Sequence, residues 1–363
     1  MLAAISLIAG GTCIYVNPQN SVIISFFGLL YPLLLLINIF FLFFWIIVRL
    51  RYSTIPLLAI LITIPVLKTY FAFHYSQKEK NPPAKTVKIM SYNVRNFDLY
   101  NWRNNGKTLQ KMMELIINER PDIACFQEFF NAESGKFQTI HRLMQEAGFK
   151  YYSFEKTVSR ENYGAWGVAT FSRYPIINHS EIRFQNSRLN SSLFTDIQID
   201  SAIVRVFNVH LQSVYLSQKD YDYLEQVSED QEVQMKPIQR IASKLKQAFL
   251  IRAPQAMKIK EEIRKSDYPV IVCGDFNDTP ASFCYHNIST DLQDAFLTAG
   301  WGTGPTYAGL FLPYRIDYIL CNKNLSAAHY KTICYKYSDH YPITCMISFP
   351  AINKTTSGFP KTP

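Results

Sequence analysis

The sequence lacks the cysteine patterns that mark a disulfide framework or a zinc site. Its seven cysteines form no CxxC pair and no zinc-type spacing, and their odd number argues against complete pairing. Cys125, Cys273 and Cys345 instead lie inside apolar, strand-like runs. We therefore expect these cysteines to be small, buried hydrophobic residues.

Glycine-rich phosphate loops and internal repeats are also absent. The chain has no GxGxxG and no GxxxxGK[ST] motif, which argues against a dinucleotide-binding or P-loop site. Charged residues make up only 18% of the chain and hydrophobic residues 48%, which excludes extended disorder, collagen and coiled coils. A length of 363 residues exceeds one ordinary domain, so we expect one large folded unit with an appendage.

Charge is scarce in the first eighty residues. This region holds five Lys or Arg residues and one acid, against 32 and 27 in residues 81–363. The net charge of +9 therefore divides into +4 and +5. Such an excess is compatible with anionic partners, but it is not the footprint of a nucleic-acid-binding surface by itself.

Long uncharged stretches predict transmembrane helices in this N-terminal region. Residues 22–48 contain no charge, and a helix of that length spans about 40 Å, more than the roughly 30 Å hydrocarbon core of a bilayer. Residues 54–67 are also apolar, and residues 1–16 are apolar without the basic start of a signal peptide. We expect about three transmembrane helices within residues 1–75, and hence an integral, multi-pass protein of the cell membrane.

The positive charges near these stretches give opposing signals about orientation. Arg49 and Arg51, between the second and third stretches, favour a cytoplasmic loop and an extracytoplasmic C-terminal region. The lysines from Lys68 to Lys88 favour the opposite orientation. We give more weight to the confined Arg-Leu-Arg loop. Asn81-Pro82-Pro83 indicates a semi-rigid linker within residues 76–85.

From residue 86 onward, short apolar runs alternate with helical segments. Residues 109–118 have the spacing of an amphipathic helix, and residues 217–265 are polar and helical in character. Strand-like runs occur at residues 87–94, 123–126, 166–171, 194–199, 203–209, 269–274, 315–321 and 343–349. The pair 194–199 and 203–209 is typical of antiparallel neighbours. Because wholly apolar and alternating strands occur together, the pattern predicts an α/β sandwich with mixed sheets.

Polar side chains follow several of these strands. Asn93, Glu128 and His210 each stand at the end of an apolar run, and Asp275 and Asn277 follow another. Strand ends collect at one edge of a packed sheet, where sites are usually built. Each residue alone also has an ordinary explanation as a turn former, a solvated loop acid or a structural histidine.

Asp317 is harder to explain in this ordinary way. It lies between Ile316 and Tyr318 in an apolar run, where an unpaired charge would cost several kcal/mol. A histidine is a natural partner, because the carboxylate would fix its tautomer and raise its basicity. Asp339-His340, just before the last strand, adds another carboxylate and imidazole.

Seven motifs, taken in this order along the chain, resemble the endonuclease/exonuclease/phosphatase superfamily. That superfamily includes deoxyribonuclease-I-like nucleases, abasic-site endonucleases, neutral sphingomyelinases and inositol-polyphosphate 5-phosphatases. The motifs are Ser91-Tyr92-Asn93-Val94, Gln127-Glu128, the stretch from Trp166 to Pro175, Asn208-Val209-His210-Leu211, Gly274-Asp275-Phe276-Asn277, Arg315-Ile316-Asp317-Tyr318 and Ser338-Asp339-His340-Tyr341-Pro342. One such motif is weak evidence, but seven in the family order are specific.

The resemblance implies a four-layered α/β sandwich, with two mixed β-sheets flanked by helices, as a catalytic domain over residues 86–350. The transmembrane segment and a tail at residues 351–363 lie outside it. The resemblance also implies a metal-dependent phosphoric ester hydrolase. Glu128 resembles the principal Mg²⁺ ligand, with Asn93 and Asp339 close to the ion and Mn²⁺ as an alternative metal. This sparse set of acids suits Mg²⁺, which takes few protein oxygens and keeps several waters.

The remaining motif residues resemble the group that acts on the phosphoryl centre. Asp317 and His340 look like the pair that deprotonates the attacking water, although some family members use Asp275 for that step. Asn277 and His210 would donate hydrogen bonds to the phosphoryl oxygens, and a protonated His210 would also assist the leaving oxygen. The implied reaction is in-line hydrolysis of a phosphoester.

Three functions follow as hypotheses. The first is a membrane-anchored phosphodiesterase or nuclease of the endonuclease/exonuclease type, acting on nucleic acid. The second keeps the chemistry but takes a phospholipid or inositol phosphate, as a sphingomyelinase does. The third is a non-catalytic membrane scaffold, which the complete motif set disfavours. Lys236, Arg240, Lys244 and Lys246 predict a solvated helix face, with an anion-binding stripe as the alternative.

Overall fold

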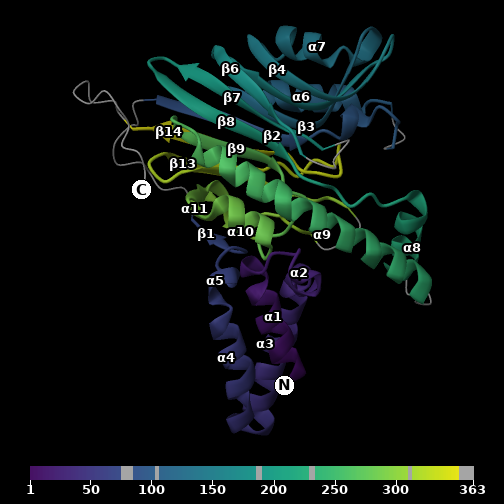
Figure 1. The fold of residues 1–363 in the computed structure, drawn as a ribbon, viewed down its shortest axis with the longest axis vertical. Helices are drawn as coiled ribbons and strands as arrows, with labels where there is room; N and C mark the ends of the chain where they lie inside the picture. The colour runs from purple at the N-terminus through teal and green to yellow at the C-terminus, as the bar shows by residue number, and fades with distance from the viewer. Residues whose placement is uncertain (75–84, 103–105, 185–189, 229–233, 310–312, 351–363) are drawn as a thin grey trace. The chain divides into compact units, whose positions relative to one another are not determined.

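The computed structural model describes residues 1–74, 85–102, 106–184, 190–228, 234–309 and 313–350 (Figure 1). Residue contacts divide the chain into two compact units. The first combines Met1–Phe71 with Gln212–Lys260 and Asn277–Thr290, and the second contains the other described residues. Two segments of the predicted sandwich domain therefore belong to the same unit as the N-terminal helices. Residues 76–84 of the predicted linker at 76–85 and the predicted tail at 351–363 lie outside the described residues, whereas Lys85 already begins strand β2 (Lys85–Asn93).

The N-terminal part of the first unit is helical. The elements are α1 (Leu2–Thr12), η1 (Cys13–Tyr15), α2 (Val22–Leu29), α3 (Tyr31–Val48), η2 (Leu50–Ser53), α4 (Thr54–Ile62) and α5 (Ile64–Leu67). Helices α1, α3 and α4 pack against one another (Figure 1). Among the described residues, α3 alone is long and apolar enough to cross a membrane, with a mean hydropathy of 2.5 over 18 residues. The apolar helices Leu2–Tyr15 and Leu50–Ile62 are shorter.

The prediction of one continuous helix over residues 22–48 was wrong. The helix breaks at Leu30, whose backbone angles of φ −86° and ψ 2° leave the α-helical region and end α2. Pro32 explains the break, because it has no N–H and its ring would clash with the carbonyl of Gly28 four residues earlier. Proline is well tolerated in the first turn of a helix, and α3 accordingly begins at Tyr31.

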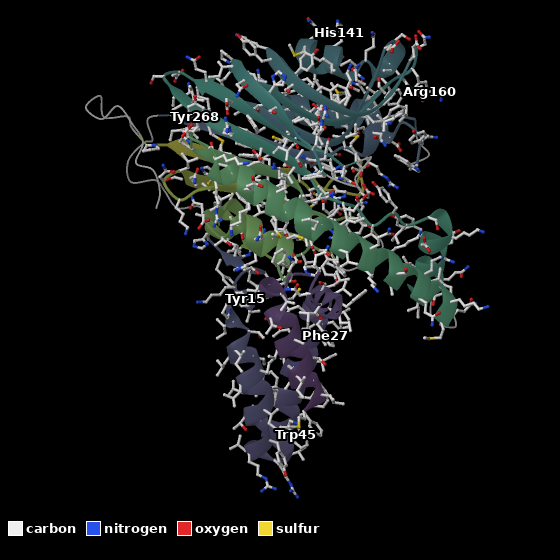
Figure 2. The ribbon with its side chains drawn as sticks, in the orientation of Figure 1. Tyr15, Phe27, Trp45, His141, Arg160 and Tyr268 are labelled. Carbon is white, nitrogen blue, oxygen red and sulfur yellow. The ribbon has the colours of Figure 1, made fainter. Side chains whose placement is uncertain are left out.

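Many large apolar side chains of these helices are exposed, although Leu7, Tyr31 and Leu35 are buried in an apolar core of the helices. Only 17% of α3 is buried, while the large apolar side chains Phe40 and Ile47 are 63% and 84% exposed. Asn38, in contrast, is buried, and its Nδ2 donates to the Ala3 carbonyl at 2.8 Å. Figure 2 shows these helices covered almost entirely by carbon.

The first unit also contains α8 (Gln218–Ser228), most of α9 (Met235–Arg264) and α10 (Phe283–Ser289). The predicted helical character of residues 217–265 is confirmed for its described parts, which form α8 and α9. Arg240 and Lys244 each contact the buried carboxylate of Asp220 at 2.6 Å. These two cations are therefore paired within the protein, which disfavours the alternative of a free anion-binding stripe at these positions.

The second unit contains two six-stranded mixed sheets. The first has the order β13-β14-β2-β3-β5-β4 and the second β10-β12-β9-β8-β7-β6. Among the described strands, β2 pairs in parallel with β3 and β8 with β9, and the other neighbours are antiparallel. The strands of the first are β2 (Lys85–Asn93), β3 (Ile123–Ala132), β4 (Tyr151–Arg160), β5 (Gly164–Ser172), β13 (Ser326–Thr332) and β14 (Ile343–Phe349). Those of the second are β6 (Ile176–Ile182), β7 (Ser192–Ile199), β8 (Ala202–His210), β9 (Val270–Asp275), β10 (Leu292–Asp294) and β12 (Asp317–Asn322). A small ribbon pairs β1 (Ala72–Phe73) with β11 (Trp301–Gly302).

The two sheets enclose one apolar core, and helices flank them. Ile89 and Cys125 of the first sheet pack with Val206 and Cys273 of the second. A second core lies beneath α6 (Thr108–Glu119) and α7 (Thr139–Gln145), and α11 (Ala295–Ala299) contacts β12 and β13. The predicted fold of two mixed β-sheets flanked by helices is confirmed.

The cysteines are free thiols, and all except Cys334 are buried, including Cys125, Cys273 and Cys345 as expected. The predicted antiparallel pair of residues 194–199 and 203–209 is also confirmed, as β7 and β8. Strands β4, β6 and β13 were not predicted. Their side chains are largely exposed and therefore give no clear apolar pattern.

Candidate active site

The sheet register brings three predicted site residues together on adjacent strands. His210 ends β8 and lies opposite Asp275, which ends the parallel strand β9. Asp275 in turn lies opposite Asp317, the first residue of the antiparallel strand β12. The C-terminal ends of the parallel strands β8 and β9 and the N-terminal end of the antiparallel strand β12 lie at the same edge of the sheet. This edge therefore collects all three side chains.

Glycine is required immediately before Asp275. Gly274 has φ +149°, and a Cβ at this position would lie 1.9 Å from the Val209 carbonyl oxygen. Any side chain here would push β9 away from β8. Gly274 therefore keeps His210 and Asp275 on neighbouring strands.

Glu128 is placed by a bulge in β3. The pairing of β3 with β5 shifts between Phe126 and Phe129, and Glu128 has a left-handed backbone with φ +47°. A bulge re-aims a side chain that regular alternation would direct elsewhere. The buried rings of Phe126 and Phe129 hold this uncommon conformation in place.

A buried amide pair ties the two sheets together at the same edge. Gln127 Nε2 donates to Asn208 Oδ1 at 2.7 Å. Asn208 Nδ2 donates to the carbonyls of Phe126 and Ala169 at 3.2 and 2.9 Å. The sequence identified both amides at strand ends, and the structure gives them a supporting role in the sandwich.

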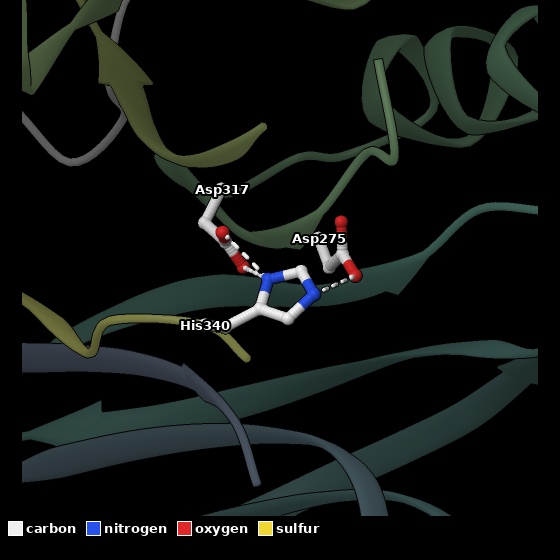
Figure 3. Close-up of side chains that lie close together, drawn as sticks. All are labelled: Asp275, Asp317 and His340. Carbon is white, nitrogen blue, oxygen red and sulfur yellow. Dashed lines mark hydrogen bonds and ion pairs between the residues drawn. The ribbon is translucent and has the colours of Figure 1, made fainter. Parts of the chain in front are cut away.

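His340 lies between two carboxylates, as Figure 3 shows. Its Nδ1 is 2.9 Å from Asp317 Oδ2 and 3.2 Å from Asp317 Oδ1, and its Nε2 is 3.6 Å from Asp275 Oδ2. The candidate ligand atoms of these three buried residues all lie within 4.8 Å of one another. Asp317 thus has the histidine partner that its apolar strand demanded.

Asn93, Glu128 and His210 complete the group around Asp275. Asn93 Nδ2 donates to Asp275 Oδ2 at 3.0 Å and to Glu128 Oε1 at 3.4 Å. His210 Nε2 is 3.9 Å from oxygens of both acids. Asn93 Oδ1 accepts the N–H of Arg95, so in this arrangement the amide acts as a donor that orients the carboxylates.

Asp339 joins the group through its neighbours. Ser338 Oγ donates to the Asn93 carbonyl at 2.9 Å, and the oxygen Oδ1 of Asp339 is 3.1 Å from Ser338 Oγ. Arg95 Nε contacts Asp339 Oδ2 at 3.3 Å. Sequence reasoning missed Arg95, which stands two residues after Asn93, and it quoted Ser338 in a motif without giving it a role.

Thr306 is a further residue that the sequence did not single out. Its Oγ1 accepts the N–H of Ile316 at 2.9 Å and of Asp317 at 3.0 Å. It therefore fixes the backbone that presents Asp317. No local pattern around Thr306 marks this role, because its partners are ten and eleven residues away.

The crowded charges shift the pKa values of both histidines. Burial acts to lower the pKa of His340, but Asp317 and then Asp275 outweigh it and raise that pKa well above its ordinary value. Burial lowers the pKa of His210, which favours the neutral imidazole. The two histidines are thus suited to different tasks.

The pKa values of two carboxylates in the group, Glu128 and Asp275, are raised. Burial and then the charge of Asp339 raise the pKa of Glu128 to about 7. Burial raises the pKa of Asp275, against the attraction of His340. Although neighbouring residues cover most of Glu128, 32% of its side chain remains exposed, which leaves it accessible to an ion from solvent. Repelling carboxylates with hard oxygen atoms fit a divalent cation.

Seven of the eight predicted site residues thus lie in the second unit and form one connected group. They are Asn93, Glu128, His210, Asp275, Asp317, Asp339 and His340. The eighth, Asn277, belongs to the first unit and has a left-handed backbone with φ +53°. Its carbonyl accepts a hydrogen bond from Arg252 of α9.

Comparisons with known proteins agree with this architecture. A family model described as the endonuclease/exonuclease/phosphatase family matches residues 90–340, and a model described as a domain of unknown function matches residues 1–70. No curated protein matches the chain.

Solved structures share the fold at low sequence identity. An endonuclease/exonuclease/phosphatase from Beutenbergia cavernae aligns with a TM-score of 0.54 and 15% identity over 73% of this chain and 72% of its own. A family protein from Leptotrichia buccalis aligns with a TM-score of 0.52 and 17% identity over 72% of this chain and 100% of its own. One from Bacteroides vulgatus gives 0.52 and 15% over 73% and 99%.

Proposed function

The chain belongs to the endonuclease/exonuclease/phosphatase family, whose members are phosphoric ester hydrolases, and from this premise we propose a membrane-anchored, Mg²⁺-dependent phosphodiesterase of the nuclease type. The observation that carries the proposal is the buried Asp317–His340–Asp275 group, with Glu128 and Asn93 beside it. Such a set combines proton transfer with oxygen ligands for a divalent cation.

Family members are typically dependent on a divalent metal, and the acidic group here fits one. In our proposal Glu128 is the principal ligand for Mg²⁺ or Mn²⁺, and Asp339 and Asn93 stand close to it. The bound ion would supply charge neutralisation at the phosphoryl oxygens. Beyond burial, the charge of Asp339 raises the pKa of Glu128, because the two carboxylates repel each other. A bound cation would relieve this repulsion, which supports the assignment.

The pKa directions favour a division of labour between Asp275 and His340. With its pKa raised, His340 carries a proton and donates to a phosphoryl oxygen, while Asp317 holds the ring through Nδ1. Asp275, with a raised pKa, is a better proton acceptor for the attacking water than an ordinary aspartate. On this assignment kcat/KM falls as pH rises through the pKa of His340. A rise over the same range would make His340 the base instead.

His210 and Asn277 complete the proposed chemistry as hydrogen-bond donors to the phosphoryl oxygens. Burial keeps His210 neutral, so it acts as a donor without carrying a charge. Protonation of the leaving oxygen by His210 is disfavoured for the same reason.

The proposal is tested by hydrolysis with the full chain in detergent. Substrates are bis-(p-nitrophenyl) phosphate, plasmid DNA, RNA and sphingomyelin vesicles, each with Mg²⁺, Mn²⁺ or EDTA. We expect metal-dependent turnover that His340→Ala abolishes and that His141→Ala, an exposed histidine on α7, leaves intact. Preference for DNA or RNA supports a nuclease, and activity confined to vesicles would replace it by a lipid phosphodiesterase. Turnover that persists in EDTA would contradict the metal-dependent mechanism.

We further propose that the N-terminal helices anchor the protein in the cell membrane as a multi-pass segment. The supporting observations are the length and hydropathy of α3 and the outward apolar side chains of the helices packed with it. Residues 1–75 would form this segment, residues 76–85 the linker and residues 86–350 the catalytic domain.

The proposed orientation places the catalytic domain on the extracytoplasmic side. Arg49 and Arg51 flank the start of η2 between α3 and α4, as expected for a cytoplasmic loop. Cys334 is the single exposed cysteine of the chain, so it reports orientation directly. A membrane-impermeant maleimide should label it in intact cells, with Cys334→Ser as the control. Labelling only after lysis would reverse the orientation.

A further inference from the structure

Helix α9 carries an arginine that is almost completely buried. Arg252 is 1% exposed, although arginine is one of the residues most costly to remove from water. A buried guanidinium is tolerated only where its donors meet acceptors. The partners of Arg252 therefore indicate why it is there.

Two of these partners belong to the loop that follows β9. Arg252 donates through Nη1 to the carbonyl of Asn277, and the same nitrogen is 3.5 Å from Asp278 Oδ2. Its Nε donates to the Ala248 carbonyl within its own helix at 3.3 Å, and its guanidinium lies 5.0 Å from the centre of the Phe249 ring. One side chain thus fixes two successive loop residues.

The loop has a conformation that needs such support. Asn277 has φ +53°, a left-handed backbone that non-glycine residues seldom adopt. Strained residues persist where surrounding contacts determine them, and they are frequent at ligand sites. Arg252 contacts the carbonyl of Asn277 and the carboxylate of Asp278, so the residues on both sides of the peptide bond between them are restrained.

We propose that Arg252 is a positioning residue for phosphoester hydrolysis, which holds Asn277 in the backbone conformation from which its amide donates to the phosphoryl group. The inference rests on the proposed function, because the role of Asn277 is part of it. It gives the helical segment between His210 and Asp275 a task, since α9 supplies the side chain that shapes the loop.

The first unit braces the same helix and loop from its N-terminal part. The ring of Phe26 in α2 packs edge-on against the ring of Phe249, with the two ring centroids 5.3 Å apart. A Cβ added to Gly28 would lie 2.4 Å from the Ala281 carbonyl, so α2 also approaches the loop backbone closely. The experiment therefore uses the full chain in detergent.

The test is a double-mutant cycle between Arg252→Met and Asn277→Ala, with kcat and KM measured on bis-(p-nitrophenyl) phosphate. Asn277→Ala should lower kcat about 100-fold, the loss typical of one donor to a developing charge. Arg252→Met should lower kcat about tenfold with KM within about twofold, because it displaces that donor without removing it. The double variant should be no slower than Asn277→Ala, since both changes remove the same interaction.

Two further variants separate positioning from general stability. Ile259→Ala removes a buried apolar side chain seven residues after Arg252 in α9, so it should lower the melting temperature and leave kcat unchanged. Arg252→Lys keeps a donor and should recover part of kcat. If Arg252→Met does not fold, Arg252→Lys carries the same cycle.

The outcomes distinguish this inference from the function beneath it. Wild-type protein without turnover would overturn both. Turnover with additive effects, about 1,000-fold in the double variant, would overturn the role of Arg252 alone. An unchanged kcat in Arg252→Met would do the same.

Discussion

The N-terminal helices and the β-sandwich each have an apolar core, but they differ in how many large apolar side chains stay exposed. In the helices, large apolar side chains such as Phe40 are exposed, and Asn38 lies inside. In the sandwich, apolar side chains fill the core between the sheets, and the buried acids Asp275 and Asp317 gather at one edge. The difference is consistent with our proposal that lipid surrounds the helices and water the sandwich.

The comparison also separates two uses of buried polar groups. Asn38 satisfies a neighbouring helix with a neutral hydrogen bond, which serves packing. Asp275 and Asp317 are charged groups held against His340, an arrangement that is costly for stability and useful for chemistry. Substitutions in the helices should therefore lower stability or membrane integration, whereas substitutions at the buried acids of the sandwich should lower activity or metal affinity.

The largest effect should come from neutralising the acid behind His340. Asp317→Asn keeps the size of the side chain but removes the charge that favours the imidazolium, so kcat should fall about 10³–10⁴-fold with the fold intact. Asp200→Asn, at an exposed acid paired with Lys85, should change kcat little. Rates are measured on bis-(p-nitrophenyl) phosphate, and folding by circular dichroism. Full activity in Asp317→Asn would remove the carboxylate–imidazole pair from the mechanism.

A charge on the outward face of α3 should break the proposed match with lipid. Phe40→Arg places a guanidinium where we propose hydrocarbon, at a cost of about 2.5–3.5 kcal/mol near the centre of a membrane helix. Membrane-integrated protein in cell fractions should fall, while Phe40→Leu stays like wild type. If Phe40→Arg integrates normally, this face of α3 is not surrounded by lipid.

The crowding of acids in the sandwich should appear as a pH-dependent metal affinity. With a pKa of about 7, Glu128 is protonated below pH 7 and must lose that proton to bind a cation. Mg²⁺ affinity should therefore fall about tenfold per pH unit below pH 7 and level off above pH 8. Calorimetry from pH 6 to 8 measures this slope, and Glu128→Gln should flatten it. A wild-type affinity independent of pH would argue against Glu128 as the principal ligand.

The smallest effect should come from the buried amide among the helices. Asn38→Leu loses the hydrogen bond to the Ala3 carbonyl, and interhelical hydrogen bonds in membrane proteins contribute about 0.6 kcal/mol on average and at most about 1.7. Thermal unfolding in detergent should shift by a few degrees, with hydrolysis unchanged below the transition. Leu36→Ala, at an outward position, serves as the control. A larger loss of thermal stability in Leu36→Ala than in Asn38→Leu would contradict the assignment of Asn38 to the interior and of Leu36 to the outer face of the helices.

Much of the fold followed from local pattern. The apolar runs at residues 269–274 and 343–349 predicted β9 and β14, and the spacing of residues 109–118 predicted α6. Strand β4 escaped because most of its side chains are exposed, so no apolar period marks it. The break at Leu30 was missed because an uninterrupted hydrophobic run hides the effect of one proline on the backbone.

The sequence alone determined which residue types stand at the strand ends, and the burial of Asp317 within an apolar strand demanded a partner. Tertiary structure decided which groups meet: His340 comes to Asp317 from 23 residues away, and register alone aligns His210 with Asp275. It also decided the left-handed backbones of Glu128 and Asn277 and the burial of Arg252 against Asn277. These features depend on contacts between distant segments, and neither periodicity nor residue spacing records the pairing that creates them.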